Sequence, residues 1–355
     1  MVAGHHYRWA LERGADPTVL AREWGPNNPA LERYPGWWQV YQPALPEEFH
    51  STTFVTERTI AWLESCAGAT SGPGTARRPF FLQCSFPDPH HPFTPPGHWW
   101  NAYRPEDMPE PATFDDSLAG APAHLRLIRG MRPSRNAVQM FGPTRELVRH
   151  AMAAEFGLVS MLDEGIGWIL AALERLGLAG DTVVVFTSDH GEMFGDHGLM
   201  LKATMHYQPC LRVPLVIARP GDRGGRTRAL ESSLDLAQTF LDLAGVAPFA
   251  DMQGRSLVPL LADRTGAVRD HCYVEEDFPL ALHGSPLPLR TRTLITGRYR
   301  YSRYSSGDAE LYDLEADPGE LRNLAEEPAM RSLRAELSER LLDAITDVSP
   351  LATAG

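Results

Sequence analysis

Residues 183–192 read Val-Val-Val-Phe-Thr-Ser-Asp-His-Gly-Glu, and this stretch decides the fold. The β-branched and aromatic residues from Val183 to Thr187 predict a buried strand. That strand runs into Asp189 and His190, two residue types that commonly bind metal ions. Because open α/β sheets bind their ligands beyond the carboxyl ends of the strands, this end of the predicted strand is the first candidate site.

Titratable side chains are dense immediately after this strand. The sixteen residues that follow His190 include Glu192, Asp196, His197, Lys202 and His206. Such density favours a functional site over the plainer alternative, an Asp that caps a turn and a His bonded to it. If the loop folds back, the Lys202 ammonium would neutralise a bound oxyanion, although most lysines are simply solvated. For His206, a donor role in the same pocket and a packed loop histidine are equally open.

A proline-rich segment supplies a second group of candidates. Residues 80–86 predict another buried strand, and residues 87–96, Pro-Asp-Pro-His-His-Pro-Phe-Thr-Pro-Pro, follow it directly. Because proline fixes φ, this loop would hold His90 or His91 at the sheet edge that carries Asp189. The alternative is a rigid surface loop with incidental histidines, and two imidazoles beside a candidate metal strand favour function.

The rest of the chain alternates helices with strands. Residues 1–48 are weakly periodic and read as irregular, with one short helix around 7–13. Apolar patterns predict helices at 50–66, 146–176, 234–244 and 330–345, and strands at 214–218 and within 270–315. Residues 87–145 read as a long surface excursion. The alternation of strands and helices, followed by a C-terminal segment rich in hairpins, predicts an α/β fold with a small C-terminal α+β subdomain. We place a catalytic domain at residues 1–265 and the subdomain at 266–355.

Composition excludes several classes of protein. The net charge of −12 argues against nucleic acid as a partner. The four cysteines form no C-x-x-C pair, which excludes a zinc ribbon and a thioredoxin-like redox site. No signal peptide and no run of about 18 apolar residues is visible, so we expect a cytoplasmic protein with no membrane partner.

Several motifs, in order, resemble those of the sulfatase family in the alkaline phosphatase superfamily. The order and spacing hold from about residue 50 to about residue 340. The similar segments are 79–92, 184–192, 195–198, 201–202, 212–215, 235–237, 252–257, 310–314 and 317–320. The resemblance implies an alkaline phosphatase-like sandwich around a central, mostly parallel sheet whose N-terminal strands are missing here.

The resemblance also implies roles at the matching positions. Asp189 and His190 correspond to a pair of metal ligands, and Lys202 to the lysine that contacts the sulfate or phosphate group. His90 corresponds to the histidine near the leaving-group oxygen, with His91 as its fallback. The Asp-His pair resembles phosphonate monoester hydrolases and choline sulfatases more than the Asp-Asn members. Since imidazole is a poor calcium ligand, we expect manganese, iron or zinc first and calcium second.

One part of the family's pattern has no match. Members begin with a strand bearing two more acidic ligands, then a Cys/Ser-x-Pro-x-Arg segment that supplies the nucleophile, then a Gly-Lys-x-His-like segment. No cysteine or serine of this chain fits that pattern. We therefore expect a metal-dependent hydrolase of small anionic sulfate esters whose sequence is truncated at its N-terminus. Whether this chain is active by itself stays open. The alternatives are a phosphonate or phosphate ester hydrolase and a non-catalytic remnant or binding module.

No sequence pattern predicts which leaving group the protein would accept. Four tryptophans lie in the irregular regions from which specificity would come: Trp37, Trp38, Trp99 and Trp100. They could form an apolar wall for an organic group, and ordinary packing is the equally plausible alternative.

Overall fold

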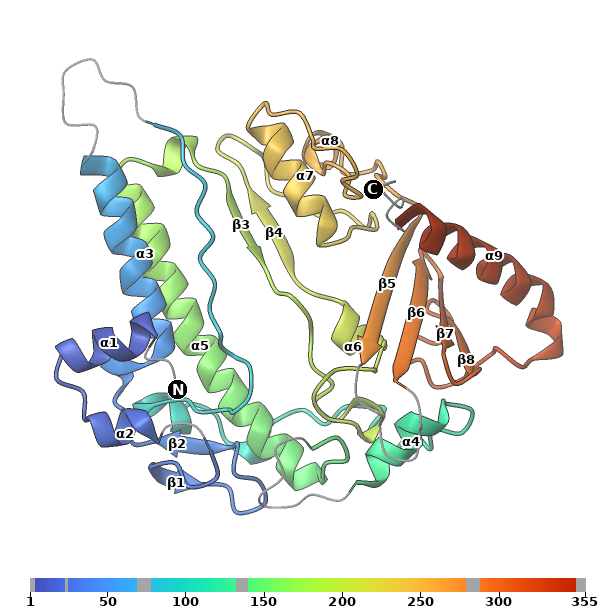
Figure 1. Cartoon of the computed structure of the whole chain (residues 1–355), viewed down its shortest axis with the longest axis horizontal. Coiled ribbons are helices and arrows are strands. Elements are labelled where there is room, and N and C mark those ends of the chain that lie inside the picture. Colours follow the sequence, from blue (N-terminus) through green and yellow to red (C-terminus); the bar gives the residue numbers. More distant parts are fainter. Residues whose placement is uncertain (1–3, 23–24, 69–77, 132–139, 279–287, 349–355) are drawn as a thin grey trace, which may run out of the picture. The chain divides into compact units, whose positions relative to one another are not determined.

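The computed structural model describes residues 4–22, 25–68, 78–131, 140–278 and 288–348, which form two compact units (Figure 1). The first unit comprises Met1–Pro111, Met131–Val185 and Ile217–Pro220. The second comprises Ala112–Gly130, Phe186–Val216 and Gly221–Gly355. Strands β3 (Val184–Thr187) and β4 (Leu215–Ala218) pair as a two-stranded sheet, and each contributes residues to both units.

Two packed helices organise the first unit. α3 (Ser51–Gly68) lies along α5 (Arg145–Arg175) (Figure 1). Leu63, Leu173 and Leu178 form a buried hydrophobic cluster. The smaller elements are α1 (His5–Glu12), α2 (Pro17–Ala21), β1 (Ala30–Arg33), β2 (Tyr41–Pro43) and the 3-10 helices η1 (Glu47–Phe49), η2 (Gly97–Asn101), η3 (Pro105–Asp107) and η4 (Ala179–Asp181). The helices predicted at 7–13, 50–66 and 146–176 are confirmed within a few residues.

α5 ends where the sequence predicts. Gly177 adopts a left-handed φ of 63°, and its amide bonds back to Glu174, while the Leu178 amide bonds to Leu173. Among the described residues α5 is also the one helix long and apolar enough to cross a membrane by length and composition. A single such helix is weak evidence, because the core helix of a globular protein passes the same test.

An antiparallel sheet organises the second unit. Its strand order is β5 (His271–Phe278), β6 (Leu289–Thr296), β7 (Tyr299–Tyr304) and β8 (Ala309–Asp313). α9 (Arg331–Val348) packs on it through a shared core that includes Leu294, Tyr301, Leu311, Leu337 and Leu341. The remaining elements are α4 (Ala123–Gly130), η5 (Asp196–Gly198), α6 (Gln208–Leu211), α7 (Leu234–Leu243), α8 (Val258–Ala262) and η6 (Pro328–Met330). The predicted hairpin-rich tail and the helices at 234–244 and 330–345 are confirmed.

Two predictions about strands are wrong. Residues 80–86 join no sheet, and their side chains alternate between half-buried and exposed, with Phe81 69% exposed. β3 exists but is not buried, since Phe186 is 41% exposed. A run of apolar residues indicates that a segment favours extended backbone and burial. Whether the segment pairs with another strand and is buried depends on other segments of the chain. The division at residue 265 stays a prediction.

Candidate metal and anion-binding site

Asp189 and His190 follow β3 directly and lie close together. The His190 Nε2 atom is 3.7 Å from Asp189 Oδ2. The other ring nitrogen, Nδ1, donates to the Gly191 carbonyl oxygen at 2.8 Å. That hydrogen bond leaves Nε2 as the ring nitrogen that can bind an ion, the arrangement usual for metal-binding histidines. Since metal–ligand bonds of about 2.0–2.2 Å let two donors this far apart share one ion, the pair fits as two ligands of a metal.

The carboxylate of this pair is in its charged form at neutral pH. Partial burial opposes that form, but a hydrogen bond from the His190 amide and the charge of the His190 ring outweigh it and lower the pKa of Asp189. Its side chain is 84% exposed. No group of three or more His, Cys, Asp or Glu suited to one ion occurs in the part of the chain that the structure describes. Two donors alone hold a divalent ion weakly against water.

Gly191 ties the end of β3 to the segment that precedes β4. Its amide donates to the Cys210 carbonyl oxygen at 2.8 Å. A Cβ at this position would lie 1.9 Å from the Pro209 carbonyl oxygen, so glycine is required for the two backbones to approach this closely. The turn after Asp189 and His190 is therefore fixed by backbone contacts.

Lys202 lies further along the same loop and pairs with Glu192. The Lys202 Nζ atom is 3.4 Å from Glu192 Oε2, and the two side chains are only 18% and 13% exposed. Burial raises the pKa of Glu192 in spite of the neighbouring ammonium. Lys202 is also the one lysine in a chain with 33 basic residues. A half-buried ammonium of this kind can bind an anion without first losing a full hydration shell.

The loop between Gly191 and Tyr207 is anchored by residues that sequence reasoning missed. His197 Nδ1 donates to Asp116 Oδ2 at 2.8 Å, and the Thr113 hydroxyl donates to Asp196 at 2.6 Å. Burial alone would raise the pKa of Asp116, but hydrogen bonds from His197 and the Leu118 amide, together with the neighbouring positive charge of Arg129, outweigh it and lower that pKa. The two anchors come from the irregular excursion, where no local pattern marks them.

His206 is packed among polar side chains. Its ring is 4% exposed, its Nδ1 atom lies 2.8 Å from Thr293 Oγ1, and its Nε2 atom lies 3.4 Å from Glu276 Oε2. Both ring nitrogens therefore have partners within the second unit. This environment favours the packed-histidine alternative, and a contact between His206 and substrate stays a prediction.

His90 and His91 lie in the first unit, on the proline-rich loop. Their rings stack with centroids 4.0 Å apart, and His90 Nδ1 donates to the His91 carbonyl oxygen at 2.5 Å. Asp88 fastens the loop to the start of α3, because its Oδ2 accepts from the Thr52 hydroxyl at 2.5 Å and the Ser51 hydroxyl at 3.0 Å. The loop is thus held by a carboxylate as well as by its prolines.

Two of the four tryptophans are core residues. Trp37 is fully buried and Trp38 is 7% exposed, which favours packing for this pair. Trp99 and Trp100 are half-buried in η2.

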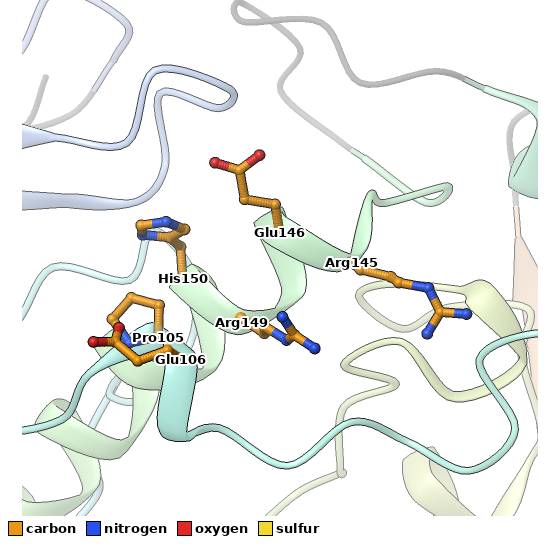
Figure 2. Close-up of a pocket in the computed structure, with 6 residues that line it drawn as sticks. All are labelled: Pro105, Glu106, Arg145, Glu146, Arg149 and His150. Carbon is orange, nitrogen blue, oxygen red and sulfur yellow. The ribbon is translucent and has the colours of Figure 1, made fainter.

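A surface pocket of about 400 Å³ in the first unit contains none of the predicted site residues (Figure 2). It is lined by Pro105, Glu106, Arg145, Glu146, Arg149 and His150. Arg145 and Arg149 both bond to Glu110, and Glu106 and Glu146 add two more carboxylates, so the pocket has no excess of positive charge. The pocket therefore adds no candidate site.

Comparison with known proteins decides the family. A sequence model described as "Sulfatase" matches residues 7–246, and one described as "N-sulphoglucosamine sulphohydrolase, C-terminal" matches residues 195–347. The chain belongs to the sulfatase family. The match to this family includes Asp189, His190 and Lys202.

Two curated relatives of this sulfatase-family chain are bacterial proteins. It is 30% identical over 318 residues to the multifunctional alkaline phosphatase superfamily protein PehA of Trinickia caryophylli, covering 84% of this chain and 60% of that protein. It is 34% identical over 278 residues to a choline-sulfatase of Rhizobium meliloti, covering 77% of this chain and 50% of that protein. The chain thus spans about half to three fifths of the length of these relatives.

A solved structure supports the fold of this sulfatase-family chain. The phosphonate monoester hydrolase of Silicibacter pomeroyi superposes with a TM-score of 0.82 at 26% identity, over 99% of this chain and 70% of that one. The α/β, alkaline phosphatase-like fold and the sulfatase resemblance are therefore confirmed.

Proposed function

We propose that this protein hydrolyses small sulfate esters with the help of a divalent metal ion. The observation that carries the proposal is the loop after β3. Within one family match it holds a metal-capable pair, Asp189 and His190, and a half-buried ammonium, Lys202.

Lys202 would bind the sulfate group of the ester. The sulfate oxygens carry negative charge, which repels a nucleophile that approaches the sulfur, and an ammonium held in a loop of low exposure offsets that charge more than bulk water does. Removing one such preorganised donor typically lowers turnover by about 10²–10³-fold. Lys202 must exchange its contact with Glu192 for the sulfate.

Asp189 and His190 would hold the metal ion through a carboxylate oxygen and Nε2. When bound, the ion would supply a positive charge that polarises the ester oxygens. Manganese, iron or zinc suits an imidazole nitrogen better than calcium does, so manganese is our first choice and calcium the second. A role for His90 at the leaving-group oxygen, with His91 as its substitute, stays a proposal that rests on the family resemblance.

Hydrolysis of 4-nitrophenyl sulfate in the presence of added manganese tests the proposal. We expect turnover by the wild type, with kcat/KM lowered about 10²–10³-fold in Lys202→Ala and at least as much in Asp189→Ala. Asp181→Ala removes an exposed carboxylate in η4, before β3, and is the matched control that should keep wild-type activity. Equal rates in all four proteins would contradict the proposal.

A phosphonate or phosphate ester hydrolase is the second candidate. The likeness to a phosphonate monoester hydrolase, at a TM-score of 0.82, favours it. Sulfate and phosphonate monoesters present similar oxygens to Lys202, so kcat/KM for an aryl sulfate and an aryl phosphonate monoester must be compared on the same preparation. A phosphonate preference that depends on Lys202 would replace the sulfatase proposal.

A non-catalytic binding module is the third candidate. The presence of two metal donors without a third, in the described part of the chain, favours it. Such a module would bind inorganic sulfate through Lys202 and show no turnover with any of these esters.

A further inference from the structure

The loop that carries Lys202 is strained. Phe194, His197, Leu201, Ala203 and Thr204 adopt left-handed backbone with φ between 39° and 76°. They are five of the eight non-glycine residues with positive φ that the structure describes. Side chains with a Cβ rarely adopt this conformation, and it persists only where surrounding contacts enforce it. Lys202 lies between Leu201 and Ala203, so its position depends on whatever enforces their conformation.

Contacts on both sides of Lys202 supply that constraint. Before it, the Leu201 carbonyl oxygen accepts from the Met193 amide at 3.1 Å, a bond within the loop itself. After it, the Thr204 amide donates to Glu276 Oε2 at 2.6 Å. Glu276 belongs to β5, so the second contact ties the loop to the four-stranded sheet. A hydrogen bond to a carboxylate is roughly twice as strong as one between neutral groups.

Glu276 also fixes the next part of the loop. The same Oε2 atom lies 3.4 Å from His206 Nε2, and His206 Nδ1 lies 2.8 Å from Thr293 on β6. Burial alone would raise the pKa of Glu276, but hydrogen bonds from His206 and Thr204 outweigh it and lower that pKa. The carboxylate is therefore ionised and able to accept from both partners at once.

We propose that Glu276 is a positioning residue, whose carboxylate holds the left-handed segment after Lys202 and thereby fixes the Lys202 ammonium for anion binding. This inference rests on the proposed function, because it is Lys202 that would bind the sulfate group. Glu276 acts through the loop backbone and His206, since its carboxylate contacts the Thr204 amide and the His206 ring.

The chemistry of the chain offers a direct readout. Because Lys202 is the only lysine, an amine-acylating reagent modifies Lys202 and the N-terminal amine alone, and peptide mapping separates the two. Four proteins made without lysine in any tag are compared: wild type, Glu276→Ala, Glu276→Gln and Glu275→Ala. Glu275 precedes Glu276 on β5, is exposed and pairs with Arg292 at 3.4 Å, so it is the matched control.

We expect Glu276→Ala to raise the acylation rate of Lys202 on the order of tenfold, the equivalent of one hydrogen bond to a charged group. Glu276→Gln should stay within about threefold of wild type, because its carboxamide oxygen still accepts from the Thr204 amide. Glu275→Ala should match the wild type. An acylation rate in Glu276→Ala equal to that in Glu275→Ala would overturn the proposal.

Two further measurements keep the test decisive. Hydrogen exchange of the wild type should show the Thr204 amide among the slowest of the loop, and fast exchange there would overturn the proposal even if Glu276→Ala does not fold. Inorganic sulfate should slow acylation of the wild type and protect Glu276→Ala at least fivefold less. If sulfate protects no protein, the role of Lys202 in the proposed function is wrong, while the acylation rates still decide the role of Glu276.

Discussion

The end of β3 and the loop that follows it are held in different ways. At the end of β3, Phe186 is 41% exposed and the Asp189 side chain is 84% exposed. In the loop, Met193 and Tyr207 are no more than 1% exposed, and side chains from distant segments bond to the backbone. The loop that carries Lys202 is thus preorganised, whereas the metal-capable pair is open and has two donors.

This difference has separate consequences for an anion at Lys202 and for a metal ion at Asp189 and His190. A preorganised ammonium is ready for an oxyanion before the ligand arrives. An exposed Asp-His pair binds a metal ion tightly only when further donors complete the coordination of that ion. Substitutions in the loop should therefore cost stability, while substitutions at the end of β3 should cost activity alone.

The largest effect on stability is expected for Gly191→Ala. The new Cβ would lie 1.9 Å from the Pro209 carbonyl oxygen, so one of the two backbones must move. We expect a loss of about 3 kcal/mol in the free energy of unfolding, measured by urea denaturation. Gly180→Ala is the matched control, since a Cβ there meets nothing within 4 Å. Equal losses for the two variants would show that the turn after His190 is not tightly packed.

A smaller effect, with a defined pH dependence, is expected for Asp116→Asn. The substitution removes the charge that accepts from His197 and should lower the free energy of unfolding by about 1–2 kcal/mol at neutral pH. Folding lowers the pKa of Asp116 below its usual 3.8, so the carboxylate contributes its full stability above that pH. That contribution is lost as the pH falls through the lower value of the folded protein.

Urea denaturation at a series of pH values measures this dependence. The difference between wild type and Asp116→Asn should narrow below pH 3.8 and then vanish. Asp115→Asn, at the exposed neighbouring position, is the control and should change stability by less than about 0.5 kcal/mol. A difference between wild type and Asp116→Asn that is the same at every pH would contradict the charged His197–Asp116 contact.

The smallest effect is expected for Phe186→Thr. Threonine, like phenylalanine, favours strands, and Phe186 is already 41% exposed, so the free energy of unfolding should change by less than about 0.5 kcal/mol. Met193→Ala, at a fully buried position of the loop, is the contrasting variant and should lose about 2 kcal/mol. A loss above about 2 kcal/mol for Phe186→Thr would show that β3 is covered.

Local pattern predicted the helices well and the strands less well. The apolar spacing of α5 and the glycine that ends it are both local, so their prediction is confirmed. Residues 80–86 have the composition of a strand but join no sheet, because strand pairing depends on a partner elsewhere in the chain. The burial predicted for β3 fails for the same reason.

The residues of the candidate site also differ in whether local sequence could identify them. Asp189, His190 and Lys202 lie within one short stretch, so density and family resemblance identify them. Asp116 and Glu276 contact the loop from positions about 80 and 70 residues away in the sequence. A lone acidic residue in an excursion or in a strand carries no signal of such a contact until the fold brings it there.

Calorimetric titration of inorganic sulfate into wild type and Lys202→Gln, with manganese present, tests the central claim most directly. The account predicts saturable sulfate binding by the wild type and a dissociation constant at least about tenfold higher in Lys202→Gln, the loss expected for one charge-assisted hydrogen bond. Equal sulfate affinity in the two proteins would contradict the claim that the loop after β3 holds Lys202 ready for an anion.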